Sequence, residues 1–327
     1  AEQVGLILPT SLCSAQVACL AADHLNRSRI GGQDGLSRFV ALPHTEGCGA
    51  SSNTDHMFVQ TMIGYITHPS TRLCLLLEHG CEKTHNDYMR RAVESFGIDP
   101  KSLGWASVQL DGGIQKVIRK VEAWFEEQLS GMSPPKKEAV GLEAISLGLA
   151  AAGEIPPDVI PQIAQLAHDL IRDGGTVILP ENSAMLNETA FLEILHREDS
   201  KPLQPTLSYA QKPTTAGLHI MEMPTTHWSE MITGLGAAGV GVILAHIGAH
   251  PMPGHPLLPV LQVSTQGLVA AQYSADLDLS LAGEPADWPG QLLDLVLDAF
   301  LHRYVPLSTK QGNVHFQMTR GLFGVSL

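Results

Sequence analysis

Short, largely apolar runs that alternate with helical segments constrain the fold of this chain more than any other feature. These runs lie at Val4–Leu8, Phe39–Leu42, Leu73–Leu77 and Trp105–Leu110, and each leads through a turn into a helical pattern. Strands that are apolar on both faces are typical of a parallel sheet covered by helices on both sides. We therefore predict an α/β fold with mainly parallel sheets, in which ligands bind beyond the carboxyl ends of the strands.

The same alternation continues through the chain and suggests two domains. Helices are predicted at 14–25, 54–66, 85–96 and 112–129, and later at 159–172, 184–196, 228–237 and 292–303. Further strands are predicted at 176–179, 218–221, 240–244 and 258–263. The stretch 131–137, with two prolines and a glycine, is predicted to be a linker. We expect an N-terminal α/β domain over 1–130, a C-terminal α/β domain over 138–327, and an active site at the strand ends and domain cleft.

Charge and cysteine content limit the kinds of molecule that the protein is expected to bind and the compartment in which it is expected to work. Lys and Arg total 20 and Asp and Glu total 33, so the net charge of −13 argues against binding to nucleic acid or to an anionic membrane. An anionic substrate would need a local positive group or a metal. The start of the chain reads as a first strand rather than a signal peptide, and no apolar run approaches the roughly 20 residues that span a bilayer. Five cysteines, an odd and sparse number, suggest reduced thiols and a cytoplasmic location.

Three successive strand-to-helix turns each carry a cysteine. Cys13 follows the first strand, the second strand leads into the segment 43–49 (PHTEGCG), and the third leads into 78–82 (EHGCE). In a parallel sheet these turns lie at one edge, so residues far apart in sequence converge. Thiolate, imidazole and carboxylate groups together are the ligands of a transition-metal site, iron or zinc before magnesium or calcium.

Each of these residue types also has a purely structural interpretation. A single cysteine at a strand end is usually a small buried hydrophobic residue, and Cys19 and Cys74 fit that description. His68 follows a helix, where it would cap the carboxyl end or contribute to the site. In the second half, Glu181 lies just past a strand. His246, His250 and His255 occupy a Gly/Pro-rich segment, which is either an ordinary polar loop or a cluster that binds metal or substrate.

At these motifs the chain resembles the altronate/galactarate dehydratase family, which includes the large subunits of sulfolactate sulfo-lyases. The matching segments, in order, are LPTSLCSAQVA (8–18), ALPHTEGCG (41–49), THPS (67–70), HGCE (79–82), DGGTVILPEN (173–182) and PGHPLLPVLQVST (253–265). The second half departs from the family pattern. The region AVGLEAISLGLAAAG stands where the family has Cys-Gly-Gly-Ser-Asp, and HIGAHPMPGH replaces a Thr-Gly-Arg-Gly loop. We expect the family's small N-terminal domain to be missing from the protein or supplied by a separate subunit.

The resemblance implies a metal-dependent hydro-lyase that dehydrates a sugar acid, altronate- or galactarate-like, to a 2-keto-3-deoxy acid. A divalent metal stabilises the negative charge that develops beside a carboxylate when the α-proton is removed. On this hypothesis His44, Cys48 and Cys81 bind the metal, with Cys13 as a further ligand and Glu82 or His68 completing the shell. Glu46 is the candidate base, and His44 and Glu82 are assigned to the catalytic group. The residues expected to contact substrate are Thr45, His68, Glu181, His246, His250 and His255.

The resemblance favours Fe²⁺, with Zn²⁺ and Mn²⁺ as alternatives. An iron–sulfur cluster on Cys13, Cys48 and Cys81 is a further alternative. Expected partners are a small anionic substrate and either a second copy of the chain or a small subunit. The alternative functions are a sulfo-lyase large subunit that acts with a small partner chain, and a non-catalytic metal- or ligand-binding relative.

Overall fold

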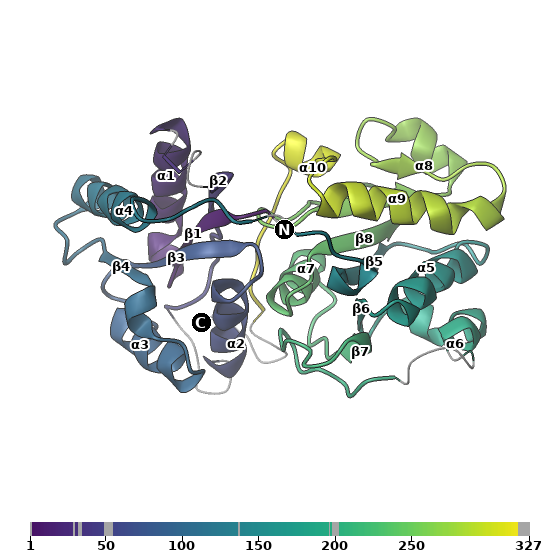
Figure 1. The fold of residues 1–327 in the computed structure, drawn as a ribbon, viewed down its shortest axis with the longest axis horizontal. Coiled ribbons are helices and arrows are strands. Elements are labelled where there is room, and N and C mark those ends of the chain that lie inside the picture. Colours follow the sequence, from purple (N-terminus) through teal and green to yellow (C-terminus); the bar gives the residue numbers. More distant parts are fainter. Residues whose placement is uncertain are drawn as a thin grey trace. The chain divides into compact units, whose positions relative to one another are not determined.

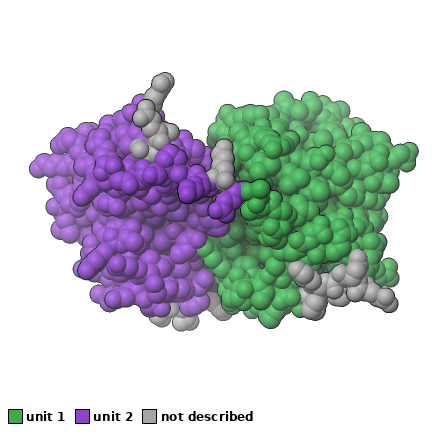
Figure 2. Space-filling view, in the orientation of Figure 1, with its two compact units in different colours: residues 1, 139–315 green, residues 2–138, 316–327 purple. Residues whose placement is uncertain are grey.

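The computed structural model divides the chain into two compact units, shown in different colours in Figure 2. One unit contains residues 2–138 and 316–327, and the other contains residues 139–315 with residue 1. The structure describes residues 2–28, 30–31, 35–48, 55–136, 138–195, 197 and 203–319. Gly49, Thr54, Lys137 and His196, which belong to motifs or bound predicted segments, lie outside the described residues. Residues 316–319 belong to the first unit, although the sequence analysis placed them in the C-terminal domain.

The first unit, here the four-strand unit, is built on a wholly parallel sheet of order β2-β1-β3-β4. Its strands are β1 (Val4–Pro9), β2 (Arg38–Ala41), β3 (Thr71–Glu78) and β4 (Gly104–Ser107). The helices between and after them are α1 (Leu12–Ser28), α2 (Asp55–Ile66), α3 (Asn86–Ser95) and α4 (Ile114–Leu129). Helices α1 and α4 pack on one face and α2 and α3 on the other (Figure 1). The predicted parallel sheet between two helical layers is confirmed.

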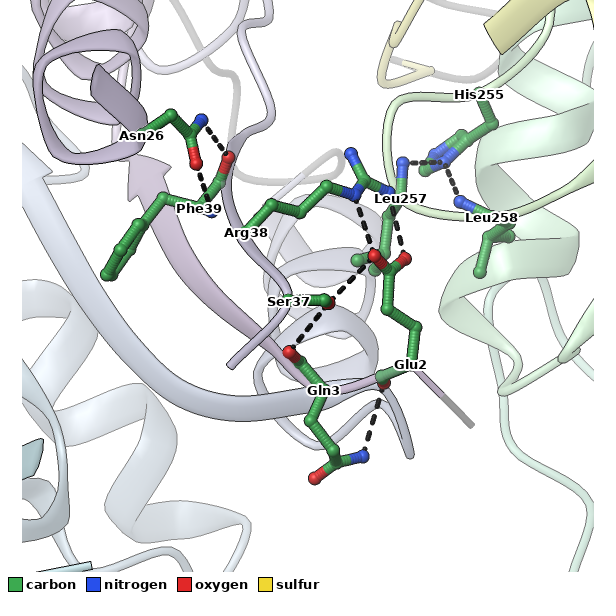
Figure 3. Close-up of polar contacts among 9 residues, drawn as sticks. All are labelled: Glu2, Gln3, Asn26, Ser37, Arg38, Phe39, His255, Leu257 and Leu258. Carbon is green, nitrogen blue, oxygen red and sulfur yellow. Dashed lines mark hydrogen bonds and ion pairs between the residues drawn. The ribbon is translucent and has the colours of Figure 1, made fainter. Parts of the chain in front are cut away.

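Side-chain hydrogen bonds hold β2, one edge strand of this sheet, to neighbouring segments of the chain (Figure 3). The Glu2 carboxylate accepts hydrogen bonds from Arg38 Nε at 3.0 Å and from Ser37 Oγ at 2.8 Å. The Asn26 side chain donates to the Phe39 carbonyl at 2.9 Å and accepts from the Phe39 N–H at 2.8 Å. These bonds tie β2 and the residue before it to Glu2, two residues before β1, and to α1. They therefore set the position of the turn that follows β2.

The second unit, here the six-strand unit, has a parallel sheet of order β10-β9-β8-β5-β6-β7. Its strands are β5 (Ser146–Ala152), β6 (Thr176–Pro180), β7 (Gly217–Met221), β8 (Val242–Ile247), β9 (Val260–Ser264) and β10 (Leu279–Ser280). The α-helices are α5 (Ile160–Arg172), α6 (Thr189–Leu195), α7 (Trp228–Ala237), α8 (Gly267–Gln272), α9 (Trp288–Phe300) and α10 (Leu307–Lys310). Counted from β5, this is the 3-2-1-4-5-6 order of doubly wound sheets. Helices α5, α6 and α9 share one core.

Strand β5 is central, and the sequence analysis did not predict it. A side-chain carbon added at Gly148 would lie 3.2 Å from both Ile243 and Val240 and 3.4 Å from Leu235 of α7. A small residue at this position therefore lets the α7 layer and the neighbouring strand pack closely.

Within the described residues, no helix is both long enough and apolar enough to cross a bilayer.

Candidate functional site

The cysteine-bearing turns lie where the chain order of the four-strand sheet reverses. From β1 the chain goes first to β2 on one side and later to β3 on the other, so the order changes between β1 and β3. In open parallel sheets the crevice beyond the carboxyl ends at such a point is where ligands bind. The turn after β1 contains Thr10 and Ser11, Cys13 is the second residue of α1, and the turn after β3 contains residues 79–82. The topology therefore brings these two turns together, with the β2 turn beside them.

The carboxylate of Glu82 joins the β1 and β3 turns. Its Oε1 accepts hydrogen bonds from Thr10 Oγ1 at 3.0 Å, Ser11 Oγ at 2.9 Å and the His79 N–H at 2.7 Å. Its Oε2 accepts from the Gly80 N–H at 2.6 Å and the Cys81 N–H at 2.8 Å. Burial raises the pKa of Glu82, but the hydrogen bonds outweigh it and lower the pKa to about 2.

These bonds change the role predicted for Glu82. Both carboxylate oxygens are occupied by donors from the two turns, so Glu82 is an ionised anchor rather than an acid–base catalyst. The same contacts orient the backbone around Cys81. They favour a structural role for Glu82 over the acid–base role that the sequence predicts.

The β2 turn is held against the β1 turn by a close backbone approach at Gly47. The Leu12 N–H donates to the Glu46 carbonyl at 2.8 Å, and Thr84 Oγ1 donates to the Thr10 carbonyl at 2.7 Å. Gly47 has φ +99°, and a side-chain carbon there would overlap the Thr10 carbonyl and lie 2.7 Å from Thr84 Oγ1. Only glycine meets both conditions, which explains the glycine between the glutamate and the cysteine.

Sulfur and imidazole groups meet at this edge. Cys13 Sγ and Cys48 Sγ are 3.5 Å apart, and His79 Nδ1 lies 3.3 Å from Cys81 Sγ. All three cysteines are exposed. The pKa of Cys13 is raised to about 11 by its hydrogen bond with Cys48, by burial, and by the negative charges of Cys48, Cys81 and Glu82. A cation bound beside Cys13 would oppose these effects and lower its pKa.

Within each of these two pairs, the separation is close to that of two ligands on one tetrahedral transition-metal ion. Sulfurs bound at about 2.3 Å in that geometry lie about 3.8 Å apart, and a sulfur and an imidazole nitrogen about 3.5 Å apart. The observed separations of 3.5 Å and 3.3 Å are close to these values. Among the described residues, His79, Cys81 and Glu82 form the one group of three or more metal-ligating side chains whose ligand atoms all lie within 4.8 Å of one another, so Cys13 and Cys48 form a separate pair.

Two predicted site histidines have other roles. His44 Nδ1 accepts from the Glu46 N–H at 3.1 Å and His44 Nε2 donates to the Pro9 carbonyl at 2.8 Å. Burial lowers the pKa of His44 to about 4, so the ring is neutral and both nitrogens serve the backbone. His68 precedes β3, so the eight residues of that strand separate it from Cys81. At about 3.3 Å per residue it lies at the opposite edge of the sheet. Neither placement suits a ligand shared with Cys81.

Thr45 and Glu46, two further residues predicted to belong to the site, lie in the turn after β2 together with Cys48. Thr45 is exposed, and its Oγ1 accepts a hydrogen bond from Gln317 Nε2 at 2.9 Å. Thr45 Oγ1 also lies 3.3 Å from Glu46 Oε1. Phe316, which precedes Gln317, is buried against Tyr65 and His44. The segment 316–319 therefore covers the inner side of this turn.

Oxidation of the metal-free protein is expected to join Cys13 to Cys48. Two exposed thiols with sulfurs 3.5 Å apart need only small side-chain rotations to form a bond of about 2.05 Å. One equivalent of hydrogen peroxide removes two electrons and two protons from the pair and is reduced to water. Peptide mapping should then show a 13–48 disulfide and a mass lower by two hydrogens. Mapping that found Cys81 in the bridge instead would contradict the geometry, and Cys13→Ala is the matched control.

The second-half residues predicted to bind substrate do not form one cluster. His246 is buried within β8, because this strand continues to Ile247 rather than ending at Leu244. His255 is buried, and its Nδ1 accepts from the N–H groups of Leu257 at 3.0 Å and Leu258 at 3.3 Å (Figure 3). His246 is therefore part of strand β8, and His255 stabilises the turn that contains Leu257 and Leu258.

Glu181 and His250 lie at the strand ends. Glu181 Oε1 accepts from the Met223 N–H at 2.7 Å and so ties the ends of β6 and β7. His250 is exposed and lines an open pocket of about 930 Å³ in the six-strand unit. Of the four second-half residues, His250 alone is among the described lining residues of that pocket.

The sequence analysis left His79 out of the candidate site. This histidine stands two residues before Cys81 in the motif already singled out, so the signal was present. His44 and His79 each follow a strand of the four-strand sheet. Whether each ring is available to a metal depends on the direction in which it points. Hydrogen bonds to the backbone, such as the one from His44 to the Pro9 carbonyl, set that direction.

Fold and site together define a parallel α/β protein of two units with a cysteine-rich site at the strand ends of the first. Sequence profiles described as D-galactarate dehydratase/altronate hydrolase, second domain, and D-galactarate/altronate dehydratase, C-terminal, match residues 4–133 and 191–287. The chain belongs to this family, whose names are those of sugar-acid dehydratases. The family assignment made from the motifs is confirmed.

Comparisons with curated proteins and with solved structures do not refine the family assignment. No curated protein matches the chain. A family 9 glycosyl transferase from Veillonella parvula is 8% identical, with 92% of this chain and 98% of that one covered and a TM-score of 0.25. UGT71G1 from Medicago truncatula, solved with UDP-glucose, is 11% identical, with 94% and 93% covered and a TM-score of 0.24. TM-scores this low do not establish a shared fold.

Proposed function

We propose that the chain is a metal-dependent hydro-lyase that dehydrates a sugar acid to a 2-keto-3-deoxy acid. The observation that carries the proposal is the presence of two close pairs, Cys13 with Cys48 and His79 with Cys81, at the strand ends of a family member. We place the metal, Fe²⁺ by family resemblance, at the His79–Cys81 pair, with Cys13 and Cys48 as the second pair of ligands, which must approach the first when an ion binds. His79 replaces His44 in the proposed ligand set because both ring nitrogens of His44 are bonded to the backbone.

A bound divalent ion would supply a Lewis acid that stabilises negative charge beside the substrate carboxylate. The protein's own groups supply positioning and proton transfer. Glu82 fixes the turn that carries His79 and Cys81, and Gly47 lets the turn that carries Cys48 approach the β1 turn. Glu46, a buried carboxylate two residues from Cys48, is proposed to take the α-proton. With Glu82 fully hydrogen-bonded, Glu46 is the carboxylate of these motifs best suited to that task.

The reaction can be written without an external oxidant or reductant. Removal of the proton at C2 and departure of the C3 hydroxyl as water give an enol. The enol takes one proton from solvent at C3 and becomes the 2-keto-3-deoxy acid. Solvent hydrogen therefore enters the product at C3, and that isotope position distinguishes dehydration from hydrolysis.

Turnover in D₂O tests this proposal. The full-length protein, purified without chelator and supplied with Fe²⁺ under anaerobic conditions, is incubated with a panel of aldonates and aldarates that includes altronate and galactarate. We expect a 2-keto-3-deoxy acid with one deuterium at C3, seen by NMR at times too short for the ketone to exchange its own protons. Release of sulfite from sulfolactate in a parallel reaction would instead identify the sulfo-lyase alternative. A chelator-treated sample is the control. Absence of product from every acid, with metal bound, would refute the proposed function.

A further inference from the structure

The six-strand unit contains a pocket that the proposed metal site does not use. This pocket of about 930 Å³ lies at the carboxyl ends of four adjacent strands, and its lining includes Ala152 of β5, Ser183 after β6, Thr226 before α7 and His250 after β8. The chain order of this sheet reverses between β5 and β8. The pocket therefore occupies the position where doubly wound sheets bind ligands.

The lining of the pocket favours an anion. Among its described lining residues there is no aspartate or glutamate, although the whole chain has a net charge of −13. The polar groups are hydroxyls, an amide and the imidazoles of His227, His250 and His315. A negatively charged ligand would meet donors there and no carboxylate on the pocket wall.

Helix α7 points its amino end into this pocket. Trp228 and Ser229, the first two residues of the helix, both line the pocket. His227 makes no side-chain cap bond, and the first helical hydrogen bond runs from the Met231 N–H to the His227 carbonyl at 3.0 Å. In the part of the chain that the structure describes, the N–H groups of Trp228, Ser229 and Glu230 have no acceptor. Free first-turn amides, together with the helix dipole, bind oxyanions.

A second, independent observation comes from Ser183, on the loop after β6. Ser183 lines the same pocket, is only 8% exposed, and its hydroxyl has no hydrogen-bond partner among the described residues. Buried polar groups are nearly always paired, so this unpaired hydroxyl beside the pocket is a donor that a bound group can use after a rotation of the side chain. On the helix itself, the Ser229 hydroxyl lies 2.8 Å from His315 Nδ1 and is held in place by that contact.

We propose that this pocket binds a small organic anion through its carboxylate or phosphate group. The oxygens of that group accept hydrogen bonds from the first-turn amides of α7 and from the Ser183 hydroxyl. The inference concerns a site separate from the cysteine residues and does not rest on the proposed dehydratase function.

Isothermal titration calorimetry on the full chain tests the site. The probes are inorganic phosphate, tartrate, and the neutral polyol threitol as a control for the tartrate skeleton. We expect one phosphate or one tartrate to bind per chain and threitol not to bind. Binding of tartrate alone identifies a carboxylate ligand, and binding of phosphate alone identifies a phosphoryl ligand. Cys81→Ser must bind the anion as tightly as the unmodified protein, because tartrate at the proposed metal centre would be lost in that variant.

Two variants test the assignment to α7 and Ser183. Thr226→Asp places a carboxylate beside the helix start on an exposed residue, and we expect it to weaken binding about tenfold or more. Ser183→Ala removes the unpaired hydroxyl and should weaken binding about tenfold. Thr189→Asp makes the same charge change at the exposed start of α6, and it should change binding less than about twofold. If no anion binds, or if Thr226→Asp and Ser183→Ala bind as tightly as Thr189→Asp, the proposal is overturned.

Discussion

Replacing Cys81 by serine is expected to remove the bound metal and, with it, the dehydratase activity. Cys81 is exposed, and its sulfur lies 3.3 Å from His79 Nδ1, so the change deletes one proposed ligand without disturbing the core. Changing groups that merely support metal ligands typically costs 10–100-fold in affinity, so losing a thiolate ligand should cost about 100-fold or more. Elemental analysis should find the purified variant essentially metal-free, and its kcat/KM should fall by at least the same factor.

Cys19→Ser is the matched control for this experiment. Cys19 lies half-buried in α1, away from the strand-end turns, and the same atom exchange there should leave metal content unchanged. Equal metal content and equal turnover in Cys81→Ser and the unmodified protein would contradict the proposed ligand set. Loss of metal from both variants would show a general effect of cysteine loss rather than ligation by Cys81.

Replacing Glu82 by glutamine is expected to lower the free energy of unfolding by about 2–3 kcal/mol at pH 7. The glutamine amide would point its own N–H₂ group at backbone N–H donors that now bond to Oε2, and those donors would lose their acceptor. The Glu82 pKa of about 2 lies below its ordinary value of 4.5, so this stabilisation is present above pH 4.5. It declines as the pH falls from about 4.5 to about 2.

Urea unfolding at several pH values measures this effect. The difference between Glu82→Gln and the unmodified protein should be largest near neutral pH and should shrink when the pH is lowered to about 3. Glu94→Gln, on the exposed face of α3, controls for the loss of one surface charge and should unfold like the unmodified protein. A Glu82→Gln variant as stable as Glu94→Gln at pH 7 would show that the carboxylate does not join the two turns.

The parallel sheet and the site edge could be predicted because they depend on residue pattern alone. Apolar runs such as Leu73–Leu77 are buried on both faces, and a parallel sheet brings every strand-to-helix turn to one edge. The convergence of Cys13 and Cys48 follows from that rule without any knowledge of side-chain positions. Strand β5 escaped prediction because its glycine and alanines have low strand propensity, and only packing against Ile243 and α7 makes them suitable.

Individual ligands could not be predicted in the same way. His44 and His79 both follow strands, yet one ring turns to the Pro9 carbonyl and the other to a cysteine sulfur. The three second-half histidines looked like a loop cluster only while β8 was expected to end at Leu244. The strand runs three residues further, which buries His246. Likewise the free hydroxyl of Ser183 is a property of the folded pocket, with no signature in the sequence.

X-ray absorption at the metal edge of protein purified without chelator tests the proposed ligands of the metal ion. We predict a first shell with sulfur atoms at about 2.3 Å and at least one nitrogen at about 2.0–2.1 Å, because the cysteine thiolates and the His79 ring would surround the ion. The sulfur signal should fall in Cys48→Ser and Cys81→Ser and remain in Cys19→Ser. A shell of oxygen and nitrogen alone around the ion of an active preparation would contradict the account.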